Sequence, residues 1–544
     1  MFHSLRGKAG AAVLLTALCF AAFTPVFAQF GAPNGDLIVA RVAVGTDADM
    51  RRVMDLGLDL MEYRDGDDLI FITTAAEIQR LLRAGFDVRV DKKLTAELPR
   101  NGVETFNGGY RTVEETYAFL NQMQAAYPNL ARVFTYGQSW LKVQNPANGY
   151  NLMGITLTSQ SSDRRPKPTF LLQAGLHARE LVPPEIATRF ISYLLTNYGI
   201  DADATWLLDE HRIVVIPIMN PDGRKIAETG ALKRKNMNNL LGGCTTVNSG
   251  IDLNRNYSFR WGLVNPSTQP CGETYPGVSA ASEPEIAYQE ALIATLFPDQ
   301  RGAPRNEPAP IDATGVVLDM HSTGNLILYP WGEDNVPPPN PQIITLANKM
   351  ASYNGYNPIQ GVNLYPTSGS AKDYAYGELG AVSMTMEIGN GSGTCGGFMP
   401  AYSCIEGGGT VGNFWSKNLP VLLYMAKTAR TPYLTAEGPT AETLTITALS
   451  TASFRFRAQF SDEFNGGQPI AAAEVYLNTP PWRGGTPIPM TPEDGSFDSM
   501  NEYALATFNI RSGTHIIYAR ARDTSGNWGS VKAVFKTDGL WPAN

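Results

Sequence analysis

The sequence predicts an α/β protein: a doubly wound mixed sheet with helices on both faces, preceded by a small α+β domain and followed by a β-sandwich. The predominantly apolar segments 169–175, 212–220, 315–321 and 382–389 predict the sheet, and helical stretches separate them. Strands that are apolar on both faces are typical of a sheet covered by helices on both sides. The chain of 544 residues is too long for one core, so we expect several domains.

The first 28 residues have the pattern of a secretory signal peptide. Arg6 and Lys8 precede the apolar run 11–23, and a small-residue cleavage site ends at Ala28. The run is too short to span a bilayer, and no later segment is longer and equally apolar. We therefore expect a secreted protein, extracellular or periplasmic, that is monomeric and has no membrane partner once mature. A net charge of −8 without a basic block argues against nucleic acid as a partner.

Residues 29–105 are predicted to be an α+β prodomain with its linker. Apolar patterns at 36–44, 69–74 and 86–90 predict strands, and those at 47–57 and 75–85 predict helices. The polar segment 91–110 has no periodicity, which indicates an exposed linker with Arg100 as a candidate protease site. A small domain, a cleavable linker and a large domain form the layout of a zymogen. The alternative is a permanent accessory domain.

A large domain is expected at 106–433 and an accessory domain at 434–544. The large domain opens with a helical pattern at 112–128 and continues through the four apolar segments. The accessory domain has short alternating segments, among them 451–460, 471–478 and 514–523, separated by turn residues. Because helical periodicity is absent there, we predict an immunoglobulin- or fibronectin-like β-sandwich.

Two of the five histidines stand directly after apolar strands, namely His177 and His321. Ligands of open α/β sheets bind beyond the carboxyl ends of the strands, so these two imidazoles are expected to converge. Glu180 follows His177 by three residues, a spacing that puts both side chains on one face of a turn. Two histidines and one carboxylate leave a zinc ion an open position for water, but an isolated HxxE pattern also arises by chance. The remaining His211 and His515 are interpreted as structural.

The motifs that accompany these residues along the chain are a more specific signal than the HxxE pattern alone. Ordered motifs occur across 110–430: "HARE" at 177, "NPDG" at 220, "LKRK" at 232, "GIDLNRNY" at 250, "CGETYPG" at 271, "MHSTGNLILYPWG" at 320, "YPTSGSAKDYAY" at 365 and "MTMEIG" at 384. In these motifs and their order the chain resembles the zinc carboxypeptidase family, which includes the pancreatic carboxypeptidases A and B. The resemblance implies a peptidase that acts on a peptide or protein substrate with a free C-terminal carboxylate.

The resemblance also implies a role for each motif residue. One zinc ion would be bound by His177, Glu180 and His321, and Asp252 would orient the ring of His177. Glu387 would be the general base, and Arg234 would stabilise the oxyanion. The substrate would be bound by Arg179, Asn254, Arg255 and Tyr365. Taken singly, each residue has an ordinary structural explanation, such as an Arg255–Asp252 ion pair.

Lys372 stands where the resemblance places the base of the pocket for the last substrate side chain. The other inferred lining residues are small or polar: Gly332, Thr367, Ser370, Ala371 and Thr385. A cation in such a pocket favours a substrate that ends in Glu or Asp. In the alternative, Lys372 pairs with a nearby acid such as Asp373 or Glu378 and leaves a broad pocket.

Four cysteines remain after the signal peptide, and export favours disulfides. Sequence proximity favours Cys244–Cys271 and Cys395–Cys404, with four free thiols as the alternative. We therefore predict a secreted zinc metallocarboxypeptidase. Two alternatives stay open: a peptidase of peptidoglycan stem peptides and a catalytically inactive binding or adhesion protein.

Overall fold

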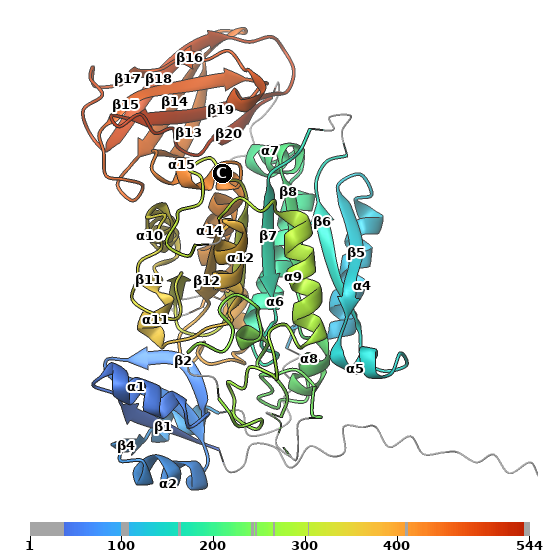
Figure 1. The fold of residues 1–544 in the computed structure, drawn as a ribbon. Coiled ribbons are helices and arrows are strands. Elements are labelled where there is room, and N and C mark those ends of the chain that lie inside the picture. Colours follow the sequence, from blue (N-terminus) through green and yellow to red (C-terminus); the bar gives the residue numbers. More distant parts are fainter. Residues whose placement is uncertain are drawn as a thin grey trace, which may run out of the picture.

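The computed structural model describes residues 37–98, 108–160, 165–240, 244, 247, 249–264, 267–302, 304–407 and 412–537. The predicted signal peptide and Arg100 lie outside these residues. Figure 1 shows a small N-terminal unit at one end of a central α/β unit and a β-rich C-terminal unit at the other end. Within the described ranges, no helix combines the length and the apolar character needed to cross a bilayer.

The N-terminal unit is a four-stranded antiparallel sheet in the order β2-β3-β1-β4, with β2 at an edge. Its elements are β1 (Ile38–Ala43), α1 (Asp47–Met54), β2 (Asp59–Asp65), β3 (Asp68–Thr73), α2 (Ala75–Arg83), β4 (Val88–Val90) and α3 (Lys92–Glu97). The expectation of an exposed linker from residue 91 is wrong for α3. Asp91 caps this helix by accepting a hydrogen bond from the amide of Leu94 at 2.9 Å, and Leu94 and Leu98 are buried one turn apart.

The central unit contains an eight-stranded mixed sheet in the order β11-β10-β12-β9-β7-β8-β6-β5. The strands are β5 (Ala131–Gln138), β6 (Asn151–Leu157), β7 (Thr169–Ala174), β8 (Arg212–Ile216), β9 (Val316–His321), β10 (Leu326–Tyr329), β11 (Asn357–Gln360) and β12 (Val382–Glu387). The inner strands β12, β9, β7 and β8 are parallel, and every residue of β7, β9 and β12 is buried. These are the four apolar segments of the sequence, and their carboxyl ends share one edge.

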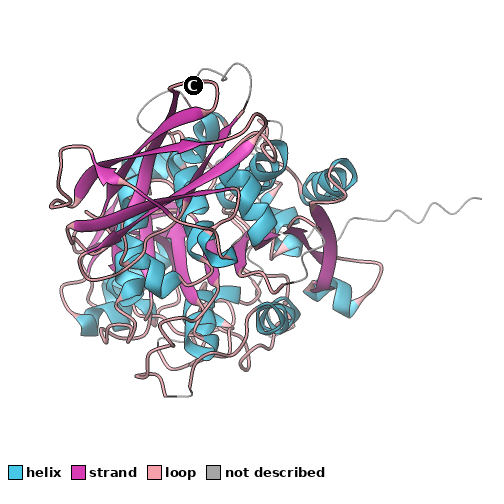
Figure 2. Ribbon diagram, turned by 90° about the horizontal axis from the view of Figure 1, so that it is seen from above, coloured by secondary structure: helices cyan, strands magenta, loops and turns pink. Residues whose placement is uncertain are grey.

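Helices lie on both faces of this sheet (Figures 1 and 2). The longer ones are α4 (Val113–Ala126), α6 (Val182–Thr196), α7 (Ala202–Glu210), α9 (Pro284–Leu296), α10 (Gln342–Asn354), α12 (Ala371–Leu379) and α14 (Phe414–Thr428). The short elements are α5 (Trp140–Gln144), α8 (Pro221–Ala227), η2 (Leu253–Arg255), α11 (Gly361–Leu364), α13 (Ser403–Glu406) and α15 (Pro432–Ala436). Pro183 lies in the first turn of α6, where a missing amide hydrogen costs little.

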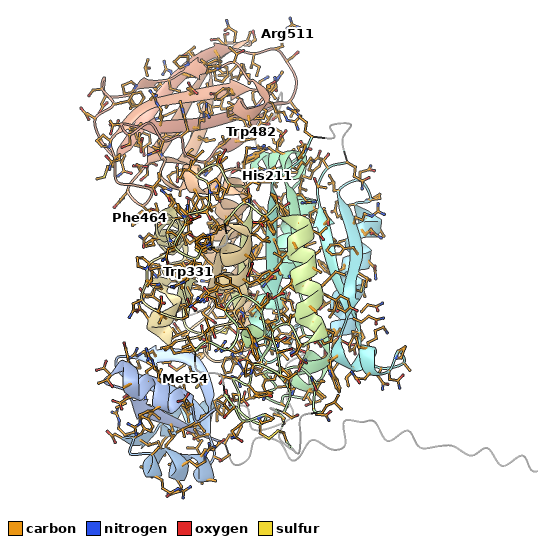
Figure 3. The ribbon with its side chains drawn as sticks, in the orientation of Figure 1. Met54, His211, Trp331, Phe464, Trp482 and Arg511 are labelled. Carbon is orange, nitrogen blue, oxygen red and sulfur yellow. A yellow bond between two sulfur atoms is a disulfide. The ribbon has the colours of Figure 1, made fainter. Side chains whose placement is uncertain are left out.

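The C-terminal unit consists of two four-stranded antiparallel sheets, β13-β14-β18-β17 and β16-β15-β19-β20. Its elements are β13 (Thr440–Ala448), β14 (Ser453–Ser461), β15 (Ile470–Leu477), η3 (Pro481–Arg483), β16 (Ile488–Pro489), β17 (Thr491–Pro492), β18 (Asn501–Asn509), β19 (His515–Asp523) and β20 (Lys532–Lys536). One apolar cluster, which includes Phe456, Phe460 and Val475, draws on both sheets. Figure 3 shows Trp482 at the junction with the central unit, above His211.

Candidate metal centre and substrate pocket

The two histidines and Glu180 converge at the shared edge of the sheet. His321 ends β9, and His177 and Glu180 follow the adjacent parallel strand β7. All three side chains are fully buried, and their ligand atoms lie within 4.8 Å of one another. The structure therefore brings together the metal-ligand set that the sequence predicts.

Both imidazoles point Nδ1 toward the centre of this set. The Nδ1 atoms are 3.0 Å apart; that of His177 lies 2.7 Å and that of His321 3.1 Å from a carboxylate oxygen of Glu180. The opposite Nε2 atoms face carboxylates, Asp252 at 3.2 Å for His177 and Asp319 at 2.9 Å for His321. Two imidazoles oriented by carboxylates plus one carboxylate ligand fit a zinc ion with an open position.

Asp319 is a site residue that the sequence interpretation missed. It lies two residues before His321 on β9, so both side chains leave the strand on the same face. A carboxylate in an otherwise apolar strand, at that spacing from a candidate ligand, was the available signal. Its position makes the two histidines equivalent, since each has one carboxylate behind its ring.

Charge shifts the ionisation of these groups. Burial alone would raise the pKa of Asp252, but Arg234 and Arg255 hold it well below its usual range. Burial opposes the charged form of His321, yet Asp319 and Glu180 raise its pKa well above its usual value. The pKa of Glu180 is lowered, because the two histidines outweigh its burial. The centre thus attracts positive charge.

Asp252 connects the metal ligands to the cationic residues of the site. Its Oδ2 accepts hydrogen bonds from Nε and Nη2 of Arg234 at 3.2 and 3.0 Å. Asp252 also directly precedes η2, which carries Asn254 and Arg255. Its Oδ1 accepts a hydrogen bond from the amide of Asn254 at 3.0 Å. Arg255 is 4.0 Å from Asp252 and donates to the Tyr365 hydroxyl at 3.3 Å. One carboxylate therefore orients a ligand ring, Arg234 and the turn with Arg255.

A pocket beside this network gathers most of the predicted substrate residues. It is lined by Asn254, Arg255, Leu328, Gly361, Leu364, Tyr365, Thr367, Ser370, Lys372, Thr385 and Glu387. Glu387 ends β12 in register with His321 of β9 and is 2% exposed. A buried carboxylate, an arginine and a lysine thus border one pocket, and the carboxylate lies in register with His321 on the neighbouring strand.

Lys372 lies at this pocket as part of an ion pair. Its Nζ donates to Ser370 Oγ and to Asp373 Oδ2, each at 3.2 Å. The amide of Gly332 also donates to Asp373 Oδ2, at 3.0 Å. A side chain at Gly361 would meet Lys372 Cε at 2.6 Å, so the absent side chain leaves room for the ammonium group. Of the residues predicted to line the pocket, Gly332 and Ala371 do not border it.

Arg179 is the predicted substrate residue that lies apart from this pocket. Its Nη1 and Nη2 donate to the two carboxylate oxygens of Asp59 in β2, both at 2.6 Å. Its guanidinium also lies 4.0 Å from the ring centroid of Phe398. Glu185, the other carboxylate of this segment, pairs with Arg111 at 2.6 Å and is not a ligand.

Two disulfides have the pairing that sequence proximity favours. Cys244 is bonded to Cys271, and Cys395 to Cys404. The first closes the loop that contains Asp252, Asn254 and Arg255. The alternative of four free thiols is therefore wrong.

The fold and the site define a zinc-dependent hydrolase with a buried His–Glu–His centre at the carboxyl edge of a mixed sheet. A zinc carboxypeptidase profile matches residues 116–410. The chain belongs to the zinc carboxypeptidase family and is a metallocarboxypeptidase that uses one zinc ion.

Individual relatives agree with this assignment. Carboxypeptidase B of Bos taurus is 27% identical over 359 residues, 64% of this chain and 77% of that protein. Carboxypeptidase A1 of Homo sapiens is 26% identical, covering 68% and 82%. A zinc carboxypeptidase of Saccharothrix mutabilis subsp. capreolus is 27% identical, covering 68% and 86%. The crystal structure of carboxypeptidase A from Helicoverpa armigera has the same fold, with a TM-score of 0.58 at 23% identity over 72% of this chain and 98% of that one.

Proposed function

We propose that the mature protein is a secreted enzyme that removes the C-terminal residue of peptides by Glu387-assisted attack of water. The observation that supports this most is the placement of Glu387 in register with His321, in a pocket shared with Asn254 and Arg255. Two disulfides are consistent with export to an oxidising compartment.

In this proposal each residue has one task. Zinc, held by His177, Glu180 and His321, would supply Lewis acidity that polarises the scissile carbonyl and acidifies water. Glu387 takes the proton from the attacking water and passes it to the leaving amine. Arg234, fixed by Asp252, stabilises the oxyanion.

The substrate's carboxylate end is bound by Asn254 and Arg255. A guanidinium binds a carboxylate through parallel N–H donors, which makes the enzyme an exopeptidase. The Tyr365 hydroxyl, already hydrogen-bonded to Arg255, closes the pocket over the bound residue.

We further propose a preference for C-terminal Glu or Asp. An ammonium group has three donors, and the hydrogen bonds of Lys372 to Ser370 and Asp373 use two of them. The third would bind a substrate carboxylate at the pocket wall. Asp373 offsets part of the positive charge, so we expect a moderate preference, about tenfold in kcat/KM over Phe, the scale of one charge-assisted hydrogen bond.

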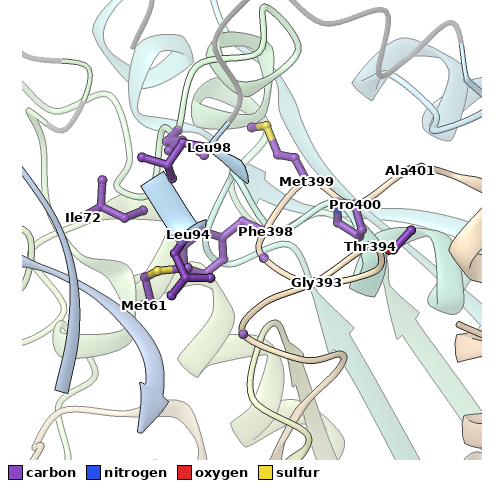
Figure 4. A pocket seen from close by; sticks show the side chains of 14 residues that line it. Met61, Ile72, Leu94, Leu98, Gly393, Thr394, Phe398, Met399, Pro400 and Ala401 are labelled. Carbon is purple, nitrogen blue, oxygen red and sulfur yellow. The ribbon is translucent and has the colours of Figure 1, made fainter. Parts of the chain in front are cut away.

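The N-terminal unit is proposed to be an inhibitory prodomain. Its apolar cluster continues into Leu328, Leu364 and Tyr365, which border the substrate pocket. A second cluster joins Met61 and Leu94 to Phe398, and Figure 4 shows these side chains together. The C-terminal unit is proposed to be an accessory β-sandwich domain.

One experiment tests these proposals together. Blocked dipeptides ending in Glu, Phe and Lys are incubated with the full chain before and after limited proteolysis, with and without a chelator. We expect chelator-sensitive release of C-terminal residues that rises after proteolysis and is fastest for Glu. Lys372→Met should abolish the Glu preference. Release of no residue from any peptide would refute the enzyme, and equal or faster cleavage of the Phe peptide would refute the acidic preference.

A further inference from the structure

Asn236 joins the two chain segments that carry Arg234 and Asp252. Arg234 lies two residues before Asn236, and Asp252 directly follows Ile251. The backbone amide of Asn236 donates to the Ile251 carbonyl at 3.1 Å, and the Ile251 amide donates to the side-chain oxygen Oδ1 of Asn236 at 3.0 Å. This pair of hydrogen bonds sets the register of one segment against the other.

The other end of the Asn236 side chain is held by two carboxylates. Its Nδ2 donates to Glu283 Oε2 at 2.8 Å and to Glu285 Oε2 at 3.3 Å. All three residues are at most 1% exposed. The two glutamates lie at the N-terminus of α9, so Asn236 is anchored on the start of a helix. Because its amide donates at one end and accepts at the other, only one orientation of the side chain satisfies all these partners.

The two segments approach each other most closely at Asn236. Gly250 has a φ of +107°, and a side chain there would meet the Asn236 carbonyl oxygen at 2.2 Å. A glycine allows both the left-handed backbone and this approach. The register that Asn236 sets is therefore built into the backbone as well as into the side chain.

The segment around Asp252 has supports that are independent of this pairing. The amide of Asp252 donates to the Tyr275 carbonyl at 2.9 Å. Further along, Asn256 Oδ1 accepts a hydrogen bond from the Glu283 amide at 3.0 Å. The turn η2 lies between these two anchors. The groups of η2 that bind the substrate carboxylate should therefore keep their place when Asn236 is changed.

The position of Arg234 depends on two neighbouring contacts. On one side its own carbonyl accepts a hydrogen bond from the Ala178 amide at 3.1 Å. On the other side Asn236 pairs with Ile251. Loss of the second contact would let the guanidinium shift against Asp252, and catalysis is sensitive to displacements of about 1 Å.

We propose that Asn236 is a positioning residue, which holds the guanidinium of Arg234 at the place where the oxyanion forms. Asn236 acts through Arg234 and is not itself a reacting group. The inference rests on the proposed function, in which Arg234 stabilises the oxyanion. It adds a residue that acts on the rate of the chemical step and leaves substrate binding to η2.

The test is a double-mutant cycle on the full chain after limited proteolysis, with a blocked dipeptide as substrate. Asn236→Ala should lower kcat about tenfold, a part of what a whole oxyanion donor supplies, and should change KM less than about twofold. In an Arg234→Gln background the same change should lower kcat less than about twofold, because the group through which Asn236 acts is already removed. Zinc content, measured on each preparation, should stay at the wild-type level.

Asn238→Ala is the matched control. Its side chain donates to Glu283 at 3.1 and 3.0 Å, so it shares this carboxylate with Asn236, whereas the Ile251 amide bonds to Asn236. This variant should keep the wild-type kcat. Asn236→Ser retains an acceptor for the Ile251 amide and should have an intermediate kcat, and it replaces Asn236→Ala in the cycle if the alanine variant does not fold.

Three results overturn the inference. The first is equal kcat in Asn236→Ala and Asn238→Ala. The second is an equal loss of kcat in both backgrounds, which indicates a general structural effect. The third is failure of both Asn236 variants to fold. Failure of the proposed function looks different: the wild type cleaves no peptide, or Arg234→Gln keeps the wild-type kcat, which removes the oxyanion role of Arg234 and the inference with it.

Discussion

Asp252 Oδ1 lies 3.2 Å from His177 Nε2, and this contact turns His177 Nδ1 toward Glu180 and His321. The same carboxylate accepts two hydrogen bonds from Arg234. A negative charge behind a ligand imidazole raises its basicity and fixes its tautomer. In the proposed zinc site, the contact would act on the metal ion through the ring of His177.

Asp252→Asn should weaken zinc binding. The amide retains the shape of the side chain and loses the charge that supports His177 and Arg234. We expect zinc affinity to fall about 10–100-fold, the usual effect of removing such a partner. Competition against a chromogenic chelator measures it. Asp312→Asn, at an exposed position, is the control, and equal zinc affinity in the two variants would contradict the prediction.

Glu387→Gln should separate zinc binding from catalysis. Glu387 is outside the set of metal ligands, so zinc content should stay at the wild-type level. Loss of a general base lowers kcat by about 10²–10⁴-fold. Metal analysis and kcat on a blocked dipeptide are measured on the same preparation. Glu378→Gln, an exposed carboxylate on α12, should behave as wild type. A Glu387→Gln enzyme with kcat near that of the control would remove Glu387 from the mechanism.

Docking of the N-terminal unit should weaken as pH rises. Burial, with the charge of Asp59, raises the pKa of Glu273 from 4.5 to about 8, while Lys235, Arg179 and Arg234 act in the opposite direction. Departure of the N-terminal unit removes the charge of Asp59 and part of the burial, which lowers the pKa of Glu273 and favours release of its proton. Its favourable contribution to docking is complete below pH 4.5 and is lost as pH approaches 8.

The dissociation constant of the two fragments, after one cut between the units, is measured by gel filtration at several pH values. It should rise by up to about tenfold per pH unit between pH 5 and 8. Glu273→Gln should flatten this slope, and Glu463→Gln, an exposed change in the C-terminal unit, should keep it. A slope that persists in Glu273→Gln would assign the proton to another group.

The clustering of the candidate metal ligands was predictable because strands that are apolar throughout put His177 and His321 at one edge of the sheet. The contact of Asp59 with Arg179 was not predictable, because the two residues are 120 positions apart and no local pattern around Asp59 indicates it. Strand β2 mixes acidic, basic and apolar residues, so alternation does not reveal it. Helix α3 was hidden by Lys92 and Lys93, although the spacing of Leu94 and Leu98 was a helical signal.

Contacts that depend on the folded structure could not be predicted from the sequence either. The sequence left two partners for Lys372, and the fold selects Asp373, which the amide of Gly332 also binds. The sequence of the C-terminal unit indicates strands, but it does not indicate which face of the sheets packs against the central unit. That face is the outer side of the β15–β19–β20 sheet, where Tyr476 and Tyr518 join the apolar cluster of the central unit.

Trp482 should determine whether the central and C-terminal units unfold together. Its ring lies 5.4 Å from that of Trp206 and 6.5 Å from that of Tyr518, and its indole N–H donates to Glu210 at 2.9 Å. Trp482→Ala removes these contacts from a half-buried position, at a cost of about 2 kcal/mol, below the range for a fully buried tryptophan. Because one apolar cluster spans both units, we expect a single denaturant transition in the wild type and two in the variant.

Tyr503→Ala is the control. Tyr503 is 37% exposed on β18, which belongs to the other sheet of the C-terminal unit, so this variant should keep one transition. Two transitions in the wild type would mean that the C-terminal unit is a tethered module, and the interface around Trp482 would then contribute little to folding.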